Sequence, residues 1–269
     1  MALQQTLASA CRVDGIGLHT GAPVRVEVRP APASRGRVFL CAGGEIPALA
    51  DYVVETRRCV TLGRGAARVS TVEHLLAALA LAGVTNAEIA VDGPELPALD
   101  GAAHHWLHAV RAAGICPQDG EVAEYTVTEP CWLEDGDSAL LLAPAAALTL
   151  YAVLTVPDTA AANMTAGGVV AEVAEEIARA RTFGLEREVA ALREAGLARG
   201  GSLENAVVLT RDGYLNARVW PQEPAWHKVL DLLGDLALLG RPLRGMVVAI
   251  RAGHRQHVAL ARRLREATA

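Results

Sequence analysis

The stretch "AWHKVLDLLGDLALLG", residues 225–240, has the pattern of a buried helix with ionisable groups along one face. Its leucines recur at helical spacing, and Gly240 followed closely by a proline marks its end. His227, Asp231 and Asp235 lie four residues apart, so they share one face of this helix. Charged groups on an apolar helix are costly to bury unless they are paired or bind a metal. The stretch therefore predicts a core helix that also carries chemistry.

The composition around this helix is that of a soluble globular protein. The chain has 269 residues, of which 52% are hydrophobic and 20% charged, which is enough for one large or two smaller domains. Its formal net charge is −5 and its one basic cluster is "RRLR" near the C-terminus, so we expect no nucleic-acid partner. No apolar run reaches membrane-spanning length, and the first residues lack the pattern of a secretory signal.

Cysteine usage indicates the compartment. Five cysteines are scattered singly, without a CxxC pair. An odd number of isolated cysteines fits a reducing environment. The sequence therefore predicts a cytoplasmic protein without disulfides.

Strand and helix signals occur in the same proportions in both halves of the chain. In the first half, expected strands cover residues 23–30, 37–42, 59–63 and 87–93, and expected helices cover 70–82 and 103–114. In the second half, expected strands cover 124–130, 139–144, 148–156, 204–210 and 245–253, and expected helices cover 169–181, 226–240 and 257–267. "ICPQDG", residues 115–120, has the Pro and Gly of a linker, and residues 157–168 are the most loop-like insertion. We therefore expect an α+β protein with domains at 1–120 and 121–269.

The i, i+4 spacing of His227 and Asp231 suits two ligands of one metal. A solvated helix edge or a simple His–Asp hydrogen bond explains the same spacing. The helix expected at 70–82 adds Glu73 and His74, for which a capping box begun by Ser70 and a core histidine are the simpler explanations. Together, however, two His and one Asp form the three-ligand set of a catalytic zinc, and a carboxylate beside a ligand can take a proton from water.

A further histidine follows the strand expected at 245–253. His254 stands in "RAGHRQH", where a strand–Gly–His turn can present an imidazole at the edge of a cleft. This position makes it a candidate for the same site.

Seven segments, in one order over nearly the whole chain, are similar to the UDP-3-O-acyl-N-acetylglucosamine deacetylases, the zinc amidases of lipid A synthesis. The segments are "DGIGLHTGAPVRVEVRPAPASRG" (14–36), "STVEHLLAAL" (70–79), "ELPALDG" (95–101), "ARTFG" (180–184), "GLARGGSLENAVVL" (196–209), "HKVLDLLGD" (227–235) and "AGH" (252–254). The resemblance implies two similar α+β domains, each a sheet plus two helices, packed as a β-α-α-β sandwich with the site at their junction.

The resemblance also implies a role for each matching residue. The implied zinc ligands are His74, His227 and Asp231, with Glu73 as general base and His254 as a cationic acid or electrostatic stabiliser. Asp235 is implied to hold that imidazole, and Thr182 to help bind the oxyanion; the implied substrate contacts are Lys228, Phe183 and Leu185. The implied partner is a small amphipathic substrate, a UDP-acyl-amino sugar or a related N-acetyl compound. His19 also matches a conspicuous position, without an assigned role.

Several substrate-side positions differ from the family pattern. Ala143 stands where a phosphate-contacting Lys is usual, Leu185 where an aromatic residue is usual, and residues 154–159 and 224–226 also differ. These changes leave open a deacetylase for another N-acetylated sugar or small amide, or a binding paralogue without turnover. They predict weak binding of UDP and weak discrimination between acylated and unacylated substrates, with Lys228 and Arg187 as the nearest replacement cations.

Two smaller features have simpler explanations. His104, His105 and His108 form a cluster in which a second metal is conceivable, but a solvated helix face is the simpler explanation. Cys59 resembles a position near the metal, where it would be a stray ligand, and is otherwise a small core residue.

Overall fold

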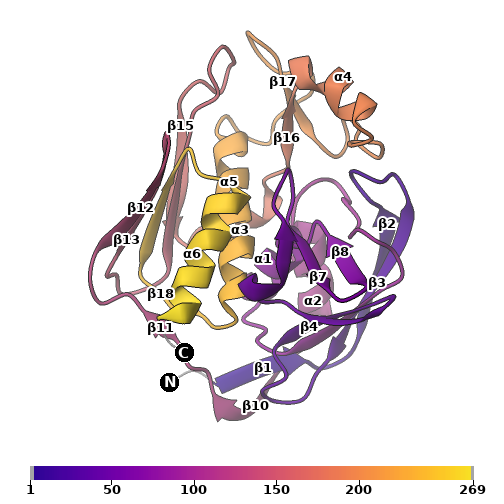
Figure 1. Cartoon of the computed structure of the whole chain (residues 1–269), viewed down its shortest axis with the longest axis vertical. Helices are drawn as coiled ribbons and strands as arrows, with labels where there is room; N and C mark the ends of the chain where they lie inside the picture. The colour runs from indigo at the N-terminus through magenta and orange to yellow at the C-terminus, as the bar shows by residue number, and fades with distance from the viewer. Residues whose placement is uncertain (1–2, 268–269) are drawn as a thin grey trace.

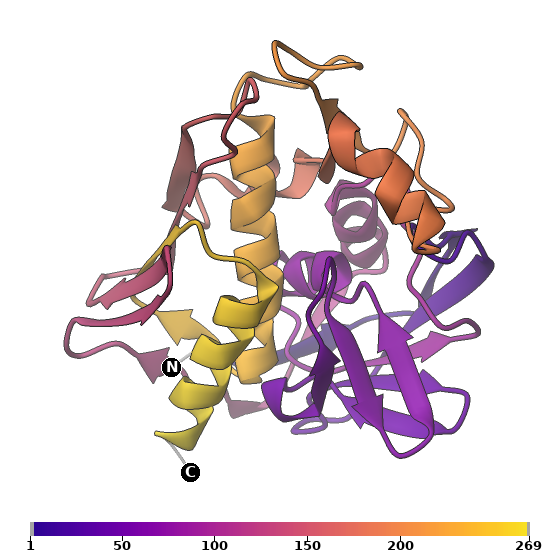
Figure 2. The same ribbon diagram turned by 45° about the horizontal axis from the view of Figure 1, so that its top comes forward.

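The computed structural model describes residues 3–267, and in it two five-stranded sheets enclose a layer of helices (Figures 1 and 2). The first sheet has the order β2 (Cys11–Ile16), β3 (Pro23–Pro30), β9 (Ala87–Val91), β4 (Arg37–Cys41), β5 (Gly44–Pro47). Its helices are α1 (Glu73–Leu81) and α2 (His104–Ala112). The alternation expected in β3 is present, since Val24, Val26 and Val28 are buried between exposed or half-buried neighbours.

The second sheet has the order β12 (Cys131–Asp135), β13 (Ser138–Ala143), β19 (Met246–Ile250), β14 (Thr149–Leu154), β15 (Met164–Val169). Its long helices are α5 (Glu223–Leu236) and α6 (His254–Glu266), and the short α3 (Ala174–Arg179) packs against α5. In Figure 1 this sheet lies at the left, with α5 and α6 on the face that looks toward the first half.

The two sheets share one topology. In each sheet, the strand that comes last in the sequence, β9 or β19, lies in the centre. It pairs antiparallel with the second strand of a hairpin, β3 or β13, on one side and parallel with β4 or β14 on the other. In each, one helix precedes that last strand, and another follows it, α1 and α2 around β9 and α5 and α6 around β19. The predicted α+β class with two similar halves is therefore confirmed.

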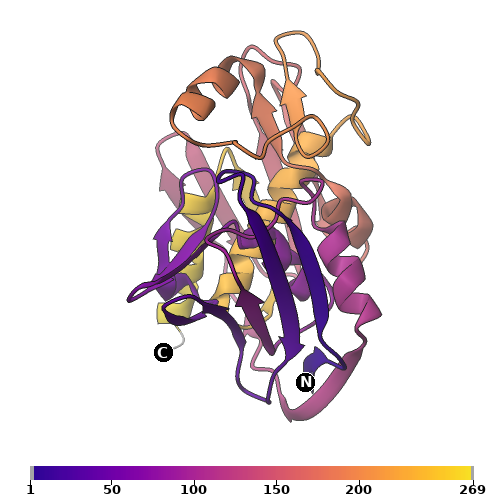
Figure 3. The same cartoon turned by 90° about the vertical axis from the view of Figure 1, so that its right-hand side faces the viewer.

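Smaller elements connect or extend the sheets. β1 (Leu3–Leu7) pairs with β10 (Ile115–Glu121), and β6 (Val53–Glu55), β7 (Thr61–Arg64) and β8 (Ala67–Ser70) form a three-stranded sheet after the 3₁₀ turn η1 (Ala50–Tyr52). β11 (Tyr125–Thr126) pairs with β18 (Leu243–Arg244), which follows the 3₁₀ turn η2 (Ala237–Leu239). β16 (Phe183–Leu185) and β17 (Val207–Leu209) form a parallel pair that, with α4 (Glu186–Glu194), stands at one end of the helical layer (Figure 3, orange).

Some local expectations were wrong. The expected linker at 115–120 is strand β10, and the end of the loop-like insertion at 157–168 is strand β15. The helix expected at 169–181 is confined to α3, because Val169 ends β15 and residues 170–173 form a turn before the helix. The last helix begins at His254 rather than residue 257. Among residues 3–267, no helix is long and apolar enough to cross a membrane.

Candidate metal-dependent active site

The two central helices approach so closely that only glycine fits at their contact. A Cβ atom on Gly234 of α5 would lie 2.1 Å from the carbonyl oxygen of Glu73, the first residue of α1. Around this contact both helices are apolar, with Leu75, Leu76 and Leu230 fully buried. The first turn of α1 is thereby held against the middle of α5.

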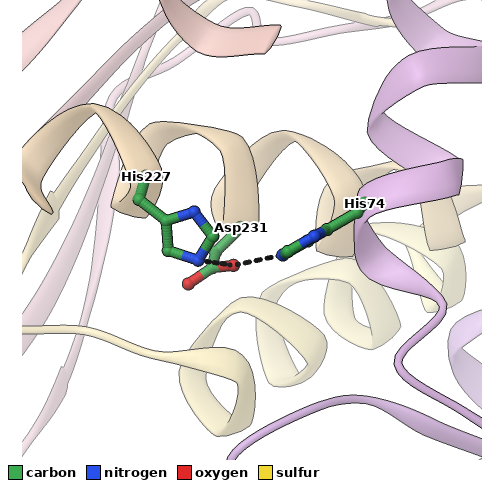
Figure 4. A group of neighbouring side chains, drawn as sticks. All are labelled: His74, His227 and Asp231. Atoms are coloured by element: carbon green, nitrogen blue, oxygen red, sulfur yellow. Dashed lines mark ion pairs between the residues drawn. The ribbon is translucent and has the colours of Figure 1, made fainter. Parts of the chain in front are cut away.

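Three buried side chains converge where these helices meet (Figure 4). His227 Nε2 lies 3.3 Å from Asp231 Oδ1, one helical turn away on α5, and His74 Nε2 of α1 lies 3.9 Å from the same oxygen. The distances are close to the separation of about 3.3 Å expected for ligand atoms 2.0–2.2 Å from a tetrahedral zinc. The structure therefore brings together His74, His227 and Asp231, as predicted from the sequence.

The donor atoms of this group fit a bound cation. His227 Nδ1 lies 3.1 Å from the carbonyl oxygen of Ala180, which only accepts, so in the neutral ring, which the lowered pKa of His227 favours, Nδ1 carries the hydrogen and Nε2 a lone pair. That lone pair faces the carboxylate of Asp231, which also only accepts. Two acceptors in contact repel each other unless a cation lies between them. Two imidazoles and one carboxylate in this arrangement could hold a metal ion.

The protonation states favour the same reading. Burial, and then the neighbouring His227, lower the pKa of His74 to about 3, and burial also lowers the pKa of His227. Both imidazoles are therefore neutral at physiological pH. Burial alone would raise the pKa of Asp231, but His227 and Lys228 hold it well below its usual range. Lys228 Nζ reinforces this with a 2.8 Å contact to Asp231 Oδ2.

Glu73 lies beside His74 and is also buried. Its Oε2 accepts a hydrogen bond from the backbone nitrogen of Val60 at 3.1 Å. Burial raises the pKa of Glu73 to about 7. His254 lowers this pKa, whereas the nearby carboxylates of Asp235 and Asp231 raise it. The capping-box explanation for Glu73 was wrong, because Ser70 belongs to β8 and the helix begins at Glu73 itself. A carboxyl with a pKa near 7 can both accept and return a proton.

A second buried cluster centres on Asp235, one turn beyond Asp231. Its Oδ2 accepts hydrogen bonds from Nδ1 of His254 and from Nδ1 of His257, both at 2.8 Å. Although burial opposes the charged imidazole, the carboxylates of Asp235 and Asp231 raise the pKa of His254 to about 10. His254 is therefore a cation at neutral pH. Because the Nδ1–H groups of His254 and His257 both donate to Asp235, we interpret this cluster as a hydrogen-bond network rather than a set of metal ligands.

A cavity of about 430 Å³ joins these groups. Nine of the ten residues proposed for the site from sequence line it: Glu73, His74, Thr182, Phe183, Leu185, His227, Lys228, Asp231 and His254. The tenth, Asp235, lies behind His254 and is hydrogen-bonded to it. β16 and the residue before it supply Thr182, Phe183 and Leu185. Lys228 Nζ lies 5.5 Å from the centre of the Phe183 ring.

Two histidines of this region had no role assigned from sequence. His257 follows His254 by three residues on α6, a spacing that places both on one helix face and was the available signal. His19 lines the cavity with a buried Nε2 that has no hydrogen-bond partner among the described residues. Glu95 fixes the loop around His19 by accepting from its backbone nitrogen at 2.8 Å. The "GLHTG" segment therefore contributes an imidazole to the cavity wall.

Other candidates lie outside the cavity or have partners. Arg187 lines a neighbouring pocket with Asp158 and Arg211, and not the cavity itself. His104 and His105 lie 3.5 and 3.8 Å from Asp100 at the start of α2, a further group with metal-ligand spacing, but His105 is exposed. Cys59 is buried in the cavity wall, where burial and then Glu73 raise the pKa of its thiol to about 12, so it is a neutral thiol.

The sequence of this chain is similar to one family of known proteins. A sequence model of UDP-3-O-acyl N-acetylglycosamine deacetylase matches residues 4–266. A UDP-3-O-acyl-N-acetylglucosamine deacetylase of Thermosynechococcus vestitus is 41% identical over 264 residues, covering 96% of this chain and 93% of its own length. Proteins of the same name from Leptospira biflexa and Myxococcus xanthus are each 39% identical, covering 96% and 97% of this chain and 88% and 86% of their own lengths.

Proposed function

This chain belongs to the UDP-3-O-acyl N-acetylglycosamine deacetylase family, and we propose that it hydrolyses the N-acetyl amide of UDP-3-O-acyl-N-acetylglucosamine in lipid A biosynthesis. In this reaction water adds to the acetyl carbonyl, the C–N bond breaks, and acetate and a free sugar amine are released. The observation that carries the proposal is the single cavity that contains a His–His–Asp group, a carboxyl with a pKa near 7 and a cationic imidazole.

The resident metal in this proposal is zinc, held by His74, His227 and Asp231. Two neutral imidazoles and one ionised carboxylate are ligands that zinc prefers, and three protein ligands leave a position open. Held by these three residues, zinc would supply Lewis-acid chemistry, polarising the amide carbonyl and making water more acidic. Lys228, through its contact with Asp231 Oδ2, fixes the carboxylate so that Oδ1 faces both imidazoles.

Glu73 and His254 divide the proton transfers. Glu73 accepts the proton of the attacking water, a role that suits a buried carboxyl with a pKa near 7. His254, protonated at neutral pH, stabilises the negative charge that develops on the carbonyl oxygen. The leaving nitrogen takes a proton from one of these two groups as the C–N bond breaks. Asp235 keeps the His254 ring oriented and charged.

The substrate side of the proposal rests on β16 and α5. Thr182 places a hydroxyl in the cavity wall for the oxyanion, and Phe183 and Leu185 give the wall its apolar part. Lys228 is paired with Asp231, so a phosphate group would have to compete with that carboxylate for it. Domains at 1–120 and 121–269, each containing one five-stranded sheet, belong to the same proposal. Five free cysteines support a cytoplasmic location.

The test is acetate release by zinc-loaded protein from UDP-3-O-acyl-N-acetylglucosamine, compared with a panel of other N-acetyl sugars. We expect the UDP-acyl sugar to be the best substrate. Faster release from another N-acetylated sugar would indicate a divergent deacetylase, as the substitutions at Ala143 and Leu185 suggest. No release from any member, with zinc bound, would indicate a binding paralogue.

A further inference from the structure

A second cavity, of about 640 Å³, lies at the opposite end of the helical layer and shares no lining residue with the active-site cavity. Leu233 and Leu236 line it from the C-terminal end of α5, and Ala80 lines it from the C-terminal end of α1. At 1.5 Å per residue, Leu236 is about 14 Å along α5 from His227. The cavity is therefore a separate site between the two halves of the molecule.

Arg37, on β4, is half-buried and lines this cavity, and no carboxylate in the described part of the chain pairs with it. Its Nη2 donates to the carbonyl oxygen of Ala237 at 3.3 Å, whereas its buried Nη1 has no hydrogen-bond partner among residues 3–267. Burial lowers the pKa of Arg37 to about 10, with no acidic group opposing it, so the side chain is still charged at neutral pH. A buried charge without a counter-charge is destabilising unless something else neutralises it.

The rest of the lining carries charges of both signs: Arg241 and Arg244 are basic, Glu121 and Glu124 are acidic, and with Arg37 the three arginines exceed the two glutamates by one. Arg241 lines the same cavity and makes no ion pair or side-chain hydrogen bond with any described residue. Arg244 lies 3.5 Å from Glu124, so that pair is neutral overall. The same lining includes the apolar side chains of Val84, Leu148, Leu233 and Leu236, beside polar ones such as Gln4 and Asn86.

We propose that this cavity binds a small organic anion, with a carboxylate or similar head group on Arg37 and a short apolar tail against the helix ends. A carboxylate offers two acceptor oxygens in the geometry of a guanidinium, so it would supply the counter-charge that Arg37 lacks. The apolar wall favours a ligand with a hydrocarbon part over a fully hydrated ion. No step of the deacetylation uses these residues, so the site adds to the proposed function.

The test uses octanoate as the probe, 1-octanol as its neutral analogue and inorganic phosphate as an anion without a tail. Binding to the zinc-loaded protein is measured by calorimetry in the wild type, in Arg37→Met and in Arg35→Met. Arg35 is the matched control, because it pairs with Glu45 and Glu88 and does not line the cavity. We expect octanoate to bind about tenfold or more weakly to Arg37→Met, and unchanged to Arg35→Met.

Stability separates ligand binding from a purely structural role of Arg37. If Arg37 serves to bind an anion, then in the absence of octanoate Arg37→Met is at least as stable as the wild type. Octanoate then raises the melting temperature of the wild type but not that of Arg37→Met. Acetate release by Arg37→Met, which should be unchanged, shows that the variant is folded. The proposal is overturned if octanoate binds both proteins equally or not at all, or if octanol or phosphate binds as well as octanoate. It is also overturned if Arg37→Met loses stability, as removal of a simple cap on Ala237 would cause.

Discussion

Replacement of Gly234 by Ala tests whether the close contact between α1 and α5 holds the metal site together. Alanine in the interior of a helix is normally about 1 kcal/mol more favourable than glycine. Here its Cβ would lie 2.1 Å from the Glu73 carbonyl oxygen, 2.8 Å from the carbonyl carbon and 3.0 Å from the Cα atom. All three are backbone atoms, so the strain can be relieved only if the helices move apart by roughly 1 Å, an overpacking that typically costs about 1–3 kcal/mol.

We therefore expect Gly234→Ala to lower the free energy of unfolding by about 1–2 kcal/mol, and the melting temperature by roughly 2–8 °C. The same displacement moves His74 away from His227 and Asp231. A shift of 1 Å at a catalytic site can reduce a rate about 10²-fold, so acetate release and zinc affinity should both fall.

The assays are thermal unfolding, zinc titration and acetate release, with Gly184→Ala as the control. Gly184 also lies in the cavity wall, but a Cβ there would meet no atom within 4 Å. This variant should keep the wild-type melting temperature. The reasoning is refuted if Gly234→Ala is more stable than the wild type and binds zinc as tightly, as a helix without a close neighbour would allow.

Three further predictions concern ligands, pH and substrate. His74→Ala, His227→Ala and Asp231→Ala should each lose most bound zinc, and near-stoichiometric zinc in all three purified variants would exclude the assignment. The rate should follow a bell-shaped pH profile: it falls as pH drops below about 7, where Glu73 becomes protonated, and as pH rises above about 10, where His254 loses its proton. A bound cation favours the deprotonated forms of Glu73 and His254, so it shifts both limbs of the profile to lower pH. A rate that stays constant from about pH 4 to 11, roughly the range over which these two groups titrate, would contradict their assigned roles. Free UDP should compete weakly with the substrate, because loss of one phosphate contact of about 1.5–3 kcal/mol weakens binding about tenfold or more. Tight competition by UDP, together with a strong requirement for the acyl chain, would show that Ala143 and Leu185 have little effect on substrate binding.

The fold class and the placement of three ionisable residues on one helix could be predicted from sequence, whereas several local elements could not. The spacing of His227, Asp231 and Asp235 places them on one helix face whatever the fold is. Their meeting with Glu73 and His74 depends on the contact at Gly234, which no local pattern reveals; the residue types suggested the grouping, and the family resemblance implied it. His257 was missed because an i, i+3 histidine on an amphipathic helix is usually a surface or core residue, and its role arises from Asp235 on another helix.

The wrong local expectations have physical causes. Residues 115–120 contain Pro and Gly, but β10 pairs only with β1, and a strand at an edge tolerates a proline that a central strand would not. β15 likewise pairs only with β14, and its glycines weaken the sequence pattern that predicts a strand. Gly167 allows it to pass the neighbouring backbone, since a Cβ there would lie 2.1 Å from the carbonyl oxygen of Leu150. The burial of Arg37 without a carboxylate partner could not be foreseen, because sequence does not show which cavity a side chain lines.

The most direct test of the central claim compares Glu73→Gln with the wild type, measuring zinc content and acetate release on the same preparations. Glutamine keeps the shape of the side chain and can still accept the hydrogen bond from Val60, but it cannot take a proton. We expect zinc content to be unchanged and acetate release to fall by about 10²–10⁴-fold. Wild-type rates in the zinc-loaded variant would contradict the account, because they would show that the proton leaves the attacking water by another route.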